Sequence, residues 1–301
     1  MSSSWSIYSD IEGNHPDRSF YEWYDADFFS RKCALLHATL THFTEAQSFY
    51  AQYGLDLEEK DKARLKLDMY FSEFHCFEAM FALMMAPFQP EPHCIYMCTY
   101  SARDIRQHAD NYLAGNIASL TSNQYQTKCE FLSAAVYSHF NPSESTEAWQ
   151  ENLEDLARLL DRLAKKYSDA LEYNFYKHGM RVSYGGPGSF KISSQEGNLE
   201  AQWDSDDSIR FMQIVGQGKE VTLRQTIKYF DPDESIHNVY LLEAIIKSMK
   251  ATRLAKIIPN THEFIVKDFR GVDKTRIEQF WAKDFSISLT VAKKEKLSST
   301  Q

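Results

Sequence analysis

The chain has 301 residues, of which 43% are hydrophobic and 25% are charged, and its net charge at pH 7 is -9. This composition supplies enough apolar material for one or two domains with a sizeable core. The negative balance argues against broad, non-specific nucleic-acid binding, which needs many Lys and Arg side chains to neutralise phosphates, but it still allows a local basic patch.

The cysteines and the hydropathy pattern predict a cytoplasmic protein without a membrane partner. Five cysteines are scattered along the chain, and reduced thiols are the simplest interpretation of an odd number. A membrane-spanning helix requires about eighteen uninterrupted apolar residues, which no segment supplies. Residues 1–5 lack the basic and apolar regions of a secretory signal.

The first half of the chain predicts helices. Residues 1–19 are polar and are expected to form a loose arm. From 20 to 53, apolar residues recur at helical spacing at Phe28, Cys33, Leu36, Leu40, Phe43, Ala46, Phe49 and Tyr50. Further helices are expected at about 57–85, 95–120 and 124–140, because prolines and turn residues separate these stretches.

A fifth helix is expected from 145 to 179, where Gly179 is suited to end it. Its apolar stripe runs along Trp149, Leu153, Leu156, Leu160, Leu163, Tyr167, Ala170, Asn174 and His178. Steps of three and four place these residues on one face. Residues 20–179 therefore predict an up-and-down bundle of about five helices.

After residue 179 the pattern changes to short strands. Strands are expected at 181–184 and 189–192 around a glycine-rich turn, and at 209–212, 221–227, 263–266 and 285–291. Helices are expected at 235–256 and 275–281. The predicted fold class is α+β: a helical bundle followed, at 180–292, by a smaller mixed domain with a mostly antiparallel sheet. Residues 293–301 are expected to fray.

The end of the fifth helix supplies the first candidate site. Asn174 and His178 are four residues apart, so their side chains are predicted to share a face. A histidine can act as general base or acid near neutral pH, and Lys177 beside it can steady negative charge. A structural interpretation stays open, since buried polar groups usually have partners and no chemistry. The catalytic candidates are His178, Asn174 and Lys177.

The string Tyr173-Asn174-Phe175-Tyr176-Lys177-His178 resembles the Arg-Asn-x-x-Lys-His motif of the HEPN superfamily, with tyrosine in the arginine position. The resemblance covers at most residues 20–179 and implies a helical bundle that cleaves RNA without metal across a homodimer, as toxins and antiviral defence effectors do. It implies that His178 is the base. Because tyrosine carries no permanent positive charge, a catalytically degenerate RNA- or nucleotide-binding derivative is the other form of this hypothesis.

A second match to the same pattern lies at Arg103-Asp104-Ile105-Arg106-Gln107-His108. It fits Arg-x4-His with a polar residue after the arginine, although a chain with ten histidines produces such matches by chance. The alternative is a solvated charged face. Arg103 and His108 are therefore reserve candidates. No spacing of His and Cys completes a zinc site, so neither a metal nor a cofactor is expected.

Two functions of different classes remain. The first is the HEPN-like protein, with RNA or a nucleotide as its partner and a homodimer as its assembly. The alternative is a non-catalytic protein-interaction subunit of a larger assembly. The acidic balance, 17 tyrosines and 20 phenylalanines favour the second, because exposed aromatic residues are common at interface hot spots.

Overall fold

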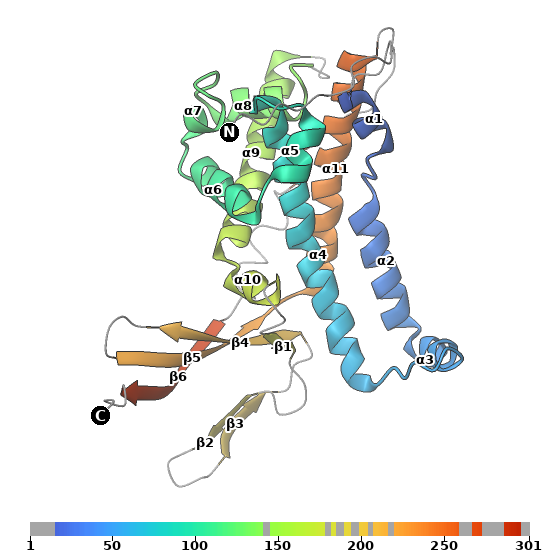
Figure 1. Cartoon of the computed structure of the whole chain (residues 1–301), viewed down its shortest axis with the longest axis vertical. Coiled ribbons are helices and arrows are strands. Elements are labelled where there is room, and N and C mark those ends of the chain that lie inside the picture. Colours follow the sequence, from blue (N-terminus) through green and yellow to red (C-terminus); the bar gives the residue numbers. More distant parts are fainter. Residues whose placement is uncertain are drawn as a thin grey trace, which may run out of the picture. The chain divides into compact units, whose positions relative to one another are not determined.

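The computed structural model describes residues 16–140, 145–177, 182–184, 190–193, 199–203, 207–215, 220–258, 267–272 and 286–295. Helices dominate it, and every strand pair that it contains is antiparallel (Figure 1). The predicted class, α+β with a helical bundle, is confirmed. The helices are α1 Pro16–Trp23, α2 Phe28–Thr41, α3 Phe43–Ala51, α4 Glu59–Met85, the 3-10 helix η1 Ala86–Phe88, α5 His93–Thr99, α6 Ala102–Leu113, α7 Ile117–Leu120, α8 Lys128–Ala135, α9 Thr146–Asp169, α10 Leu171–Lys177 and α11 Pro232–Ile257.

The two longest helices agree with their predictions because their ends carry strong local signals. A proline follows α4 within η1, where it cannot continue an α-helix. A proline also occupies the first position of α11, and the Asp231 carboxylate before it accepts hydrogen bonds from the backbone N–H groups of Asp233 and Glu234. None of the described helices is both long enough and apolar enough to cross a bilayer.

The other predicted helices are shorter than expected. The stretch at 20–53 forms α1, α2 and α3, and 95–120 forms α5, α6 and α7. Ser101 begins α6 with a capping box, and Thr127 begins α8 with another, so each new helix has its own start. Helix α1 begins at Pro16, so residues 16–19 of the predicted loose arm are helical; residues 1–15 lie outside the described part.

Two compact units share the chain. Unit 1 contains residues 1–29, 75–168 and 240–274, and unit 2 contains residues 30–74, 169–239 and 275–301. Each unit therefore takes segments from both halves of the sequence. The boundary predicted between residues 179 and 180 falls inside unit 2.

Arg253 of α11 organises the interior of unit 1. Its guanidinium donates hydrogen bonds to the Leu83 carbonyl at 2.7 Å, to the Ala135 carbonyl at 2.9 Å and to the Tyr21 hydroxyl at 2.6 Å. Leu83 lies in the last turn of α4, and Ala135 is the last residue of α8, so both carbonyls lack a partner within their own helices. A cation at two helix C-termini also interacts favourably with their dipoles.

Unit 2 contains the sheets. The strands are β1 Val182–Tyr184, β2 Phe190–Ser193, β3 Leu199–Trp203, β4 Ser208–Val215, β5 Glu220–Tyr229 and β6 Ser286–Glu295. One sheet has the order β1-β4-β5-β6, and β2 pairs with β3. The strands expected at 181–184 and 189–192 therefore do not pair with each other, and β3 was not predicted.

The last described strand, β6, is longer than the sequence predicted. Strand β6 continues through Glu295, so residues 293–295, which were predicted to fray, lie in a strand. It pairs with β5 along its length, which explains why it extends beyond the predicted end. The predicted strand at 263–266 and the predicted helix at 275–281 lie outside the described residues, as do residues 296–301.

Candidate functional site

Two of the three predicted catalytic residues lie on α10, which is a separate helix. The helical pattern breaks at Ala170, so the stripe expected from Trp149 to His178 does not follow one continuous helix. Its middle part, from Leu153 to Tyr167, is buried as predicted. Asn174 and Lys177 belong to α10, while His178 lies outside the described residues.

Aromatic side chains of α10 pack into unit 2. Tyr173 has no exposed surface, and its ring centre lies 5.2 Å from that of Phe74 on α4. The Tyr176 ring stacks on Phe71 at 4.0 Å, and the Phe175 ring stacks on that of Phe211 from β4 at 5.4 Å. The residue in the arginine position of the resembled motif is therefore a core side chain.

A buried ion pair also holds α10. The Glu172 carboxylate accepts a hydrogen bond from the Tyr70 hydroxyl at 2.6 Å and one from Lys228 Nζ at 2.7 Å. The side chain of Glu172 is 2% exposed and that of Lys228 is 15% exposed. Since Tyr70 belongs to α4 and Lys228 to β5, this carboxylate joins α10 to a helix and to the sheet.

The remaining candidates on α10 have different environments. Asn174 is half-buried, and Lys177 is exposed at the end of the helix. Lys177 Nζ lies 4.8 Å from the centre of the Tyr173 ring, a distance typical of a cation–π contact. The structure thus brings Lys177 and Tyr173 together, and the chemistry expected of His178 stays a prediction.

The reserve candidates on α6 do not share a face. Arg103 is exposed and His108 is half-buried, and five residues of a helix turn through about 500°, which leaves them on different sides. His108 instead faces Asp104. Burial lowers the pKa of His108, and the nearby Asp104 carboxylate partly opposes this effect. Asp104 already accepts the backbone N–H and the hydroxyl of Ser101 in the α6 capping box.

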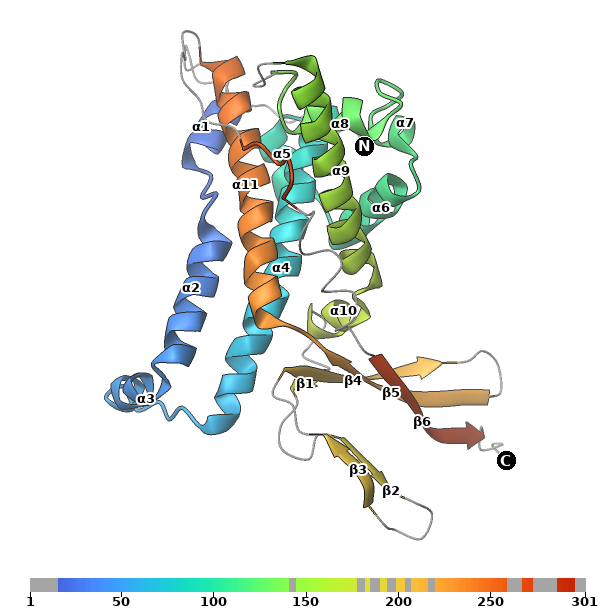
Figure 2. The same cartoon turned by 180° about the vertical axis from the view of Figure 1, so that it is seen from behind.

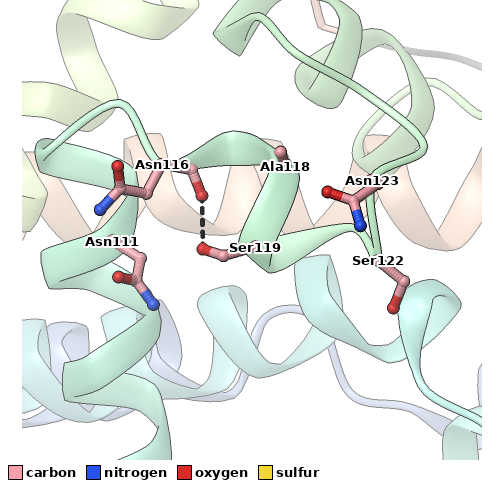
Figure 3. Close-up of a pocket in the computed structure, with 6 residues that line it drawn as sticks. All are labelled: Asn111, Asn116, Ala118, Ser119, Ser122 and Asn123. Carbon is pink, nitrogen blue, oxygen red and sulfur yellow. Dashed lines mark hydrogen bonds between the residues drawn. The ribbon is translucent and has the colours of Figure 1, made fainter.

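Figure 3 shows the side chains that line an open pocket beside α6 and α7. Amide and hydroxyl side chains dominate its lining, and the Ser119 hydroxyl donates a 2.6 Å hydrogen bond to the Asn116 carbonyl. The lining residues are Asn111, Asn116, Ala118, Ser119, Ser122 and Asn123. They include no charged group to attract an ionic ligand and no aromatic ring, so this pocket has little chemistry of its own.

Exposed apolar side chains near the start of the chain are more distinctive. Phe28 and Phe49 were among the apolar positions that predicted the first helix, and such stripes normally face a core. They are instead 52% and 53% exposed. Six of the eight large hydrophobic side chains that are exposed in the described residues lie between 23 and 55: Trp23, Phe28, Leu35, Phe49, Tyr53 and Leu55.

We call Phe49, Tyr50, Tyr53 and Leu55 the α3 surface. The Phe49 ring centre lies 5.2 Å from that of Tyr53 and 5.8 Å from that of Tyr50. Figures 1 and 2 show α3 at the turn between α2 and α4, within unit 2. The aromatic spacing predicted a helix but did not predict that this face is exposed. Spacing indicates which residues share a helical face, and it does not indicate whether another element covers that face.

The backbone under the α3 surface is fixed by hydrogen bonds. The Leu55 N–H donates to the Tyr50 carbonyl and the Gly54 N–H to the Ala51 carbonyl, which together form a Schellman motif. Gly54 has a φ of 71°, the left-handed conformation that this motif requires. The Gln47 amide also donates to the Leu57 carbonyl at 2.8 Å. The exposed rings are therefore carried by an ordered helix end.

The rim of the α3 surface is acidic. The segment 52–58 contains Asp56 and Glu58 and no Lys or Arg. Lys60 Nζ lies 2.6 Å from Glu58 and offsets part of its charge, so the negative excess of this segment comes mainly from Asp56. Aromatic residues that stack on nucleic-acid bases are normally accompanied by a positive groove, which this rim does not supply.

The part of the chain that the structure describes contains no group of three or more His, Cys, Asp or Glu side chains that could hold a metal ion. The chain matches no protein-family model, no curated protein and no solved structure. The α3 surface and α10 are therefore the features of the described residues that bear on function.

Proposed function

We propose that this chain is a non-catalytic protein-interaction subunit that docks through the α3 surface. The observation that carries the proposal is the exposure of Phe49, Tyr53 and Leu55 on an ordered helix end, at 53%, 69% and 56%. Contiguous exposed apolar groups with a polar rim mark interaction sites in soluble proteins. Aromatic side chains are also the residue type that dominates binding energy at interfaces.

The acidic residues beside the α3 surface indicate the charge expected on the partner's surface. Asp56 and Glu58 favour an apolar surface flanked by Lys or Arg over one flanked by carboxylates, because like charges oppose association. Such a subunit works in the cytoplasm, where its five cysteines would stay reduced.

Photocrosslinking in the source cells tests the proposal. A photoreactive phenylalanine analogue replaces Tyr53 in one strain and Tyr240 in the control strain. Tyr240 is a suitable control because it is 53% exposed on α11 and lies outside the α3 surface. We expect discrete protein adducts from position 53 and only background from position 240. Equal labelling at both positions, or none at either, would contradict the proposal.

RNA binding or cleavage at α10 is the second candidate. The observation in its favour is that Lys177 is exposed at the helix end, immediately before His178. The test is incubation of wild type and His178→Ala with labelled total RNA without added metal. Cleavage that is lost in the variant would support a HEPN-like ribonuclease. Unchanged cleavage in the variant would move attention to His108, and no cleavage by either protein would reject catalysis.

A further inference from the structure

We propose that the α3 surface binds the exposed face of α2 from a second copy of this chain. The inference rests on the proposed interaction function and adds the identity of the partner. In a two-fold symmetric dimer, each copy would supply one α2 face and one α3 surface, so the contact would be made twice.

Residues 30–41 of α2 present an apolar face that the described structure leaves exposed. In this stretch Ser30 and Cys33 are buried, while Leu35 is 70% exposed. Ala34 and Ala38 are exposed beside Leu35, and steps of three and four place them on one side of the helix. The small side chains of the two alanines beside Leu35 leave room for aromatic rings of a partner to pack against this face.

The charges of the two surfaces are complementary. Residues 30–41 contain Arg31 and Lys32 and no carboxylate, although the whole chain is acidic. The segment 52–58 has the opposite pattern, with Asp56 and Glu58 and no basic residue. Pairing α2 of one copy with the α3 surface of the other therefore brings opposite charges together around an apolar centre.

Self-complementarity favours a second copy over a foreign partner. A foreign partner would have to match an apolar surface with an acidic rim, and the same chain already carries an apolar face with basic residues. An antiparallel arrangement satisfies both contacts at once, because α3 follows α2 after a single residue, His42. Each copy would then place its own α3 near the N-terminal half of the partner's α2.

Sedimentation of the purified full-length chain over a concentration series is the first test. We expect a reversible dimer whose dissociation constant rises with salt, because charge pairs at the rim are screened. Leu35→Asp and Tyr53→Asp should each weaken the dimer by at least about ten-fold. Tyr240→Asp, an exposed site outside both surfaces, should leave it unchanged. Circular dichroism and urea unfolding check that the variants remain folded.

A charge exchange makes the test specific. One variant carries Arg31→Glu with Lys32→Glu, and the other carries Asp56→Lys with Glu58→Lys. Each variant alone should be monomeric, since like charges would meet at both contacts. An equimolar mixture should recover the dimer, because opposite charges then meet at both contacts. Failure of the mixture to associate, with each variant folded, would overturn the proposed pairing.

The two proposals fail in different ways. A wild-type chain that stays monomeric up to its highest soluble concentration would overturn self-association. Adducts from position 53 with a protein of another mass would then still support the interaction function. Absence of both the dimer and the adducts would reject both proposals.

Discussion

Glu172 is a carboxylate with almost no contact with water, and Lys228 supplies the cation beside it. Replacing Lys228 by Met removes that cation and leaves the charge buried next to the Tyr70 hydroxyl. Breaking a buried pair from one side costs about 3 to 5 kcal/mol, and the partial exposure of Lys228 places the expected loss near the lower value. Urea unfolding measures it.

The matched control is the double variant Glu172→Gln with Lys228→Met. It removes both charges, and the side-chain carbonyl oxygen of the glutamine can still accept a hydrogen bond from the Tyr70 hydroxyl. We expect it to recover most of the stability lost in Lys228→Met. A double variant as unstable as the single one would show that the ion pair is not what anchors α10.

His108 should make stability sensitive to mild acid. Burial lowers the pKa of this imidazole more strongly than Asp104 raises it. In the unfolded chain His108 has the ordinary histidine pKa of about 6.5, so in mild acid it binds a proton more readily there than in the folded chain. The stability that the neutral imidazole contributes is complete above the unfolded-state pKa, and it is lost as the pH falls below that value and through the lower folded-state pKa. His108→Gln should flatten the loss, measured as thermal midpoints between about pH 7.5 and 5.

A second histidine provides the comparison. Burial also lowers the pKa of His139, with Lys256 acting in the same direction. A residual slope should therefore remain in His108→Gln and decrease further when His139→Gln is added. Identical slopes in wild type and His108→Gln would contradict the assignment.

At the scale of elements, α3 and α6 end in the same way. Gly115 follows α6 with a φ of 74°, and the N–H groups of Gly115 and Asn116 donate to the Tyr112 and Asn111 carbonyls in the same pattern as those of Gly54 and Leu55. A Cβ at either glycine would have no atom within 4 Å, so Gly54→Ala and Gly115→Ala suffer from backbone conformation alone. Each should lose about 1 to 2 kcal/mol in urea unfolding.

These two variants separate helix capping from docking. Only Gly54→Ala disturbs the backbone that carries Tyr53 and Leu55, so only this variant should also weaken self-association in sedimentation. Equal dimerisation by both variants would mean that the geometry of the α3 end does not matter for binding.

The elements also show where prediction from sequence succeeds. Helices α4 and α11 were predictable because prolines and capping residues at their ends act locally. The break at Ala170 was not predictable, because neither Gly nor Pro marks it and the apolar spacing continues across it. Phe49 illustrates the same limit for the candidate site: its spacing predicts a helix but does not say what covers its face.

At the scale of the molecule, the units cannot be separated by one cut. A chain ending at residue 179 would lose residues 240–257 of α11 from unit 1 and every described strand of unit 2. We expect residues 1–179 to unfold without a cooperative transition, as followed by circular dichroism in urea. A cooperative transition with wild-type helicity per residue would show that the bundle is autonomous.

The interleaving of the units could not be read from the sequence. Arg253 contacts Leu83 and Ala135, which precede it by 170 and 118 residues. No local pattern indicates that a basic residue near the end of one helix donates hydrogen bonds to the ends of two earlier helices. The predicted boundary at 179 followed the change from helical to strand patterns, whereas the compact units follow these long-range contacts.

The position of Arg253 late in the sequence affects when unit 1 can fold during synthesis. The carbonyls of Leu83 and Ala135 leave the ribosome long before the guanidinium that binds them is translated. At about 5 to 20 residues per second, the 170 residues between Leu83 and Arg253 take roughly 10 to 30 s to synthesise. During vectorial synthesis the C-terminal carbonyls of α4 and α8 are hydrogen-bonded to water for that interval, so the interior of unit 1 can reach the arrangement described here only after α11 has been translated.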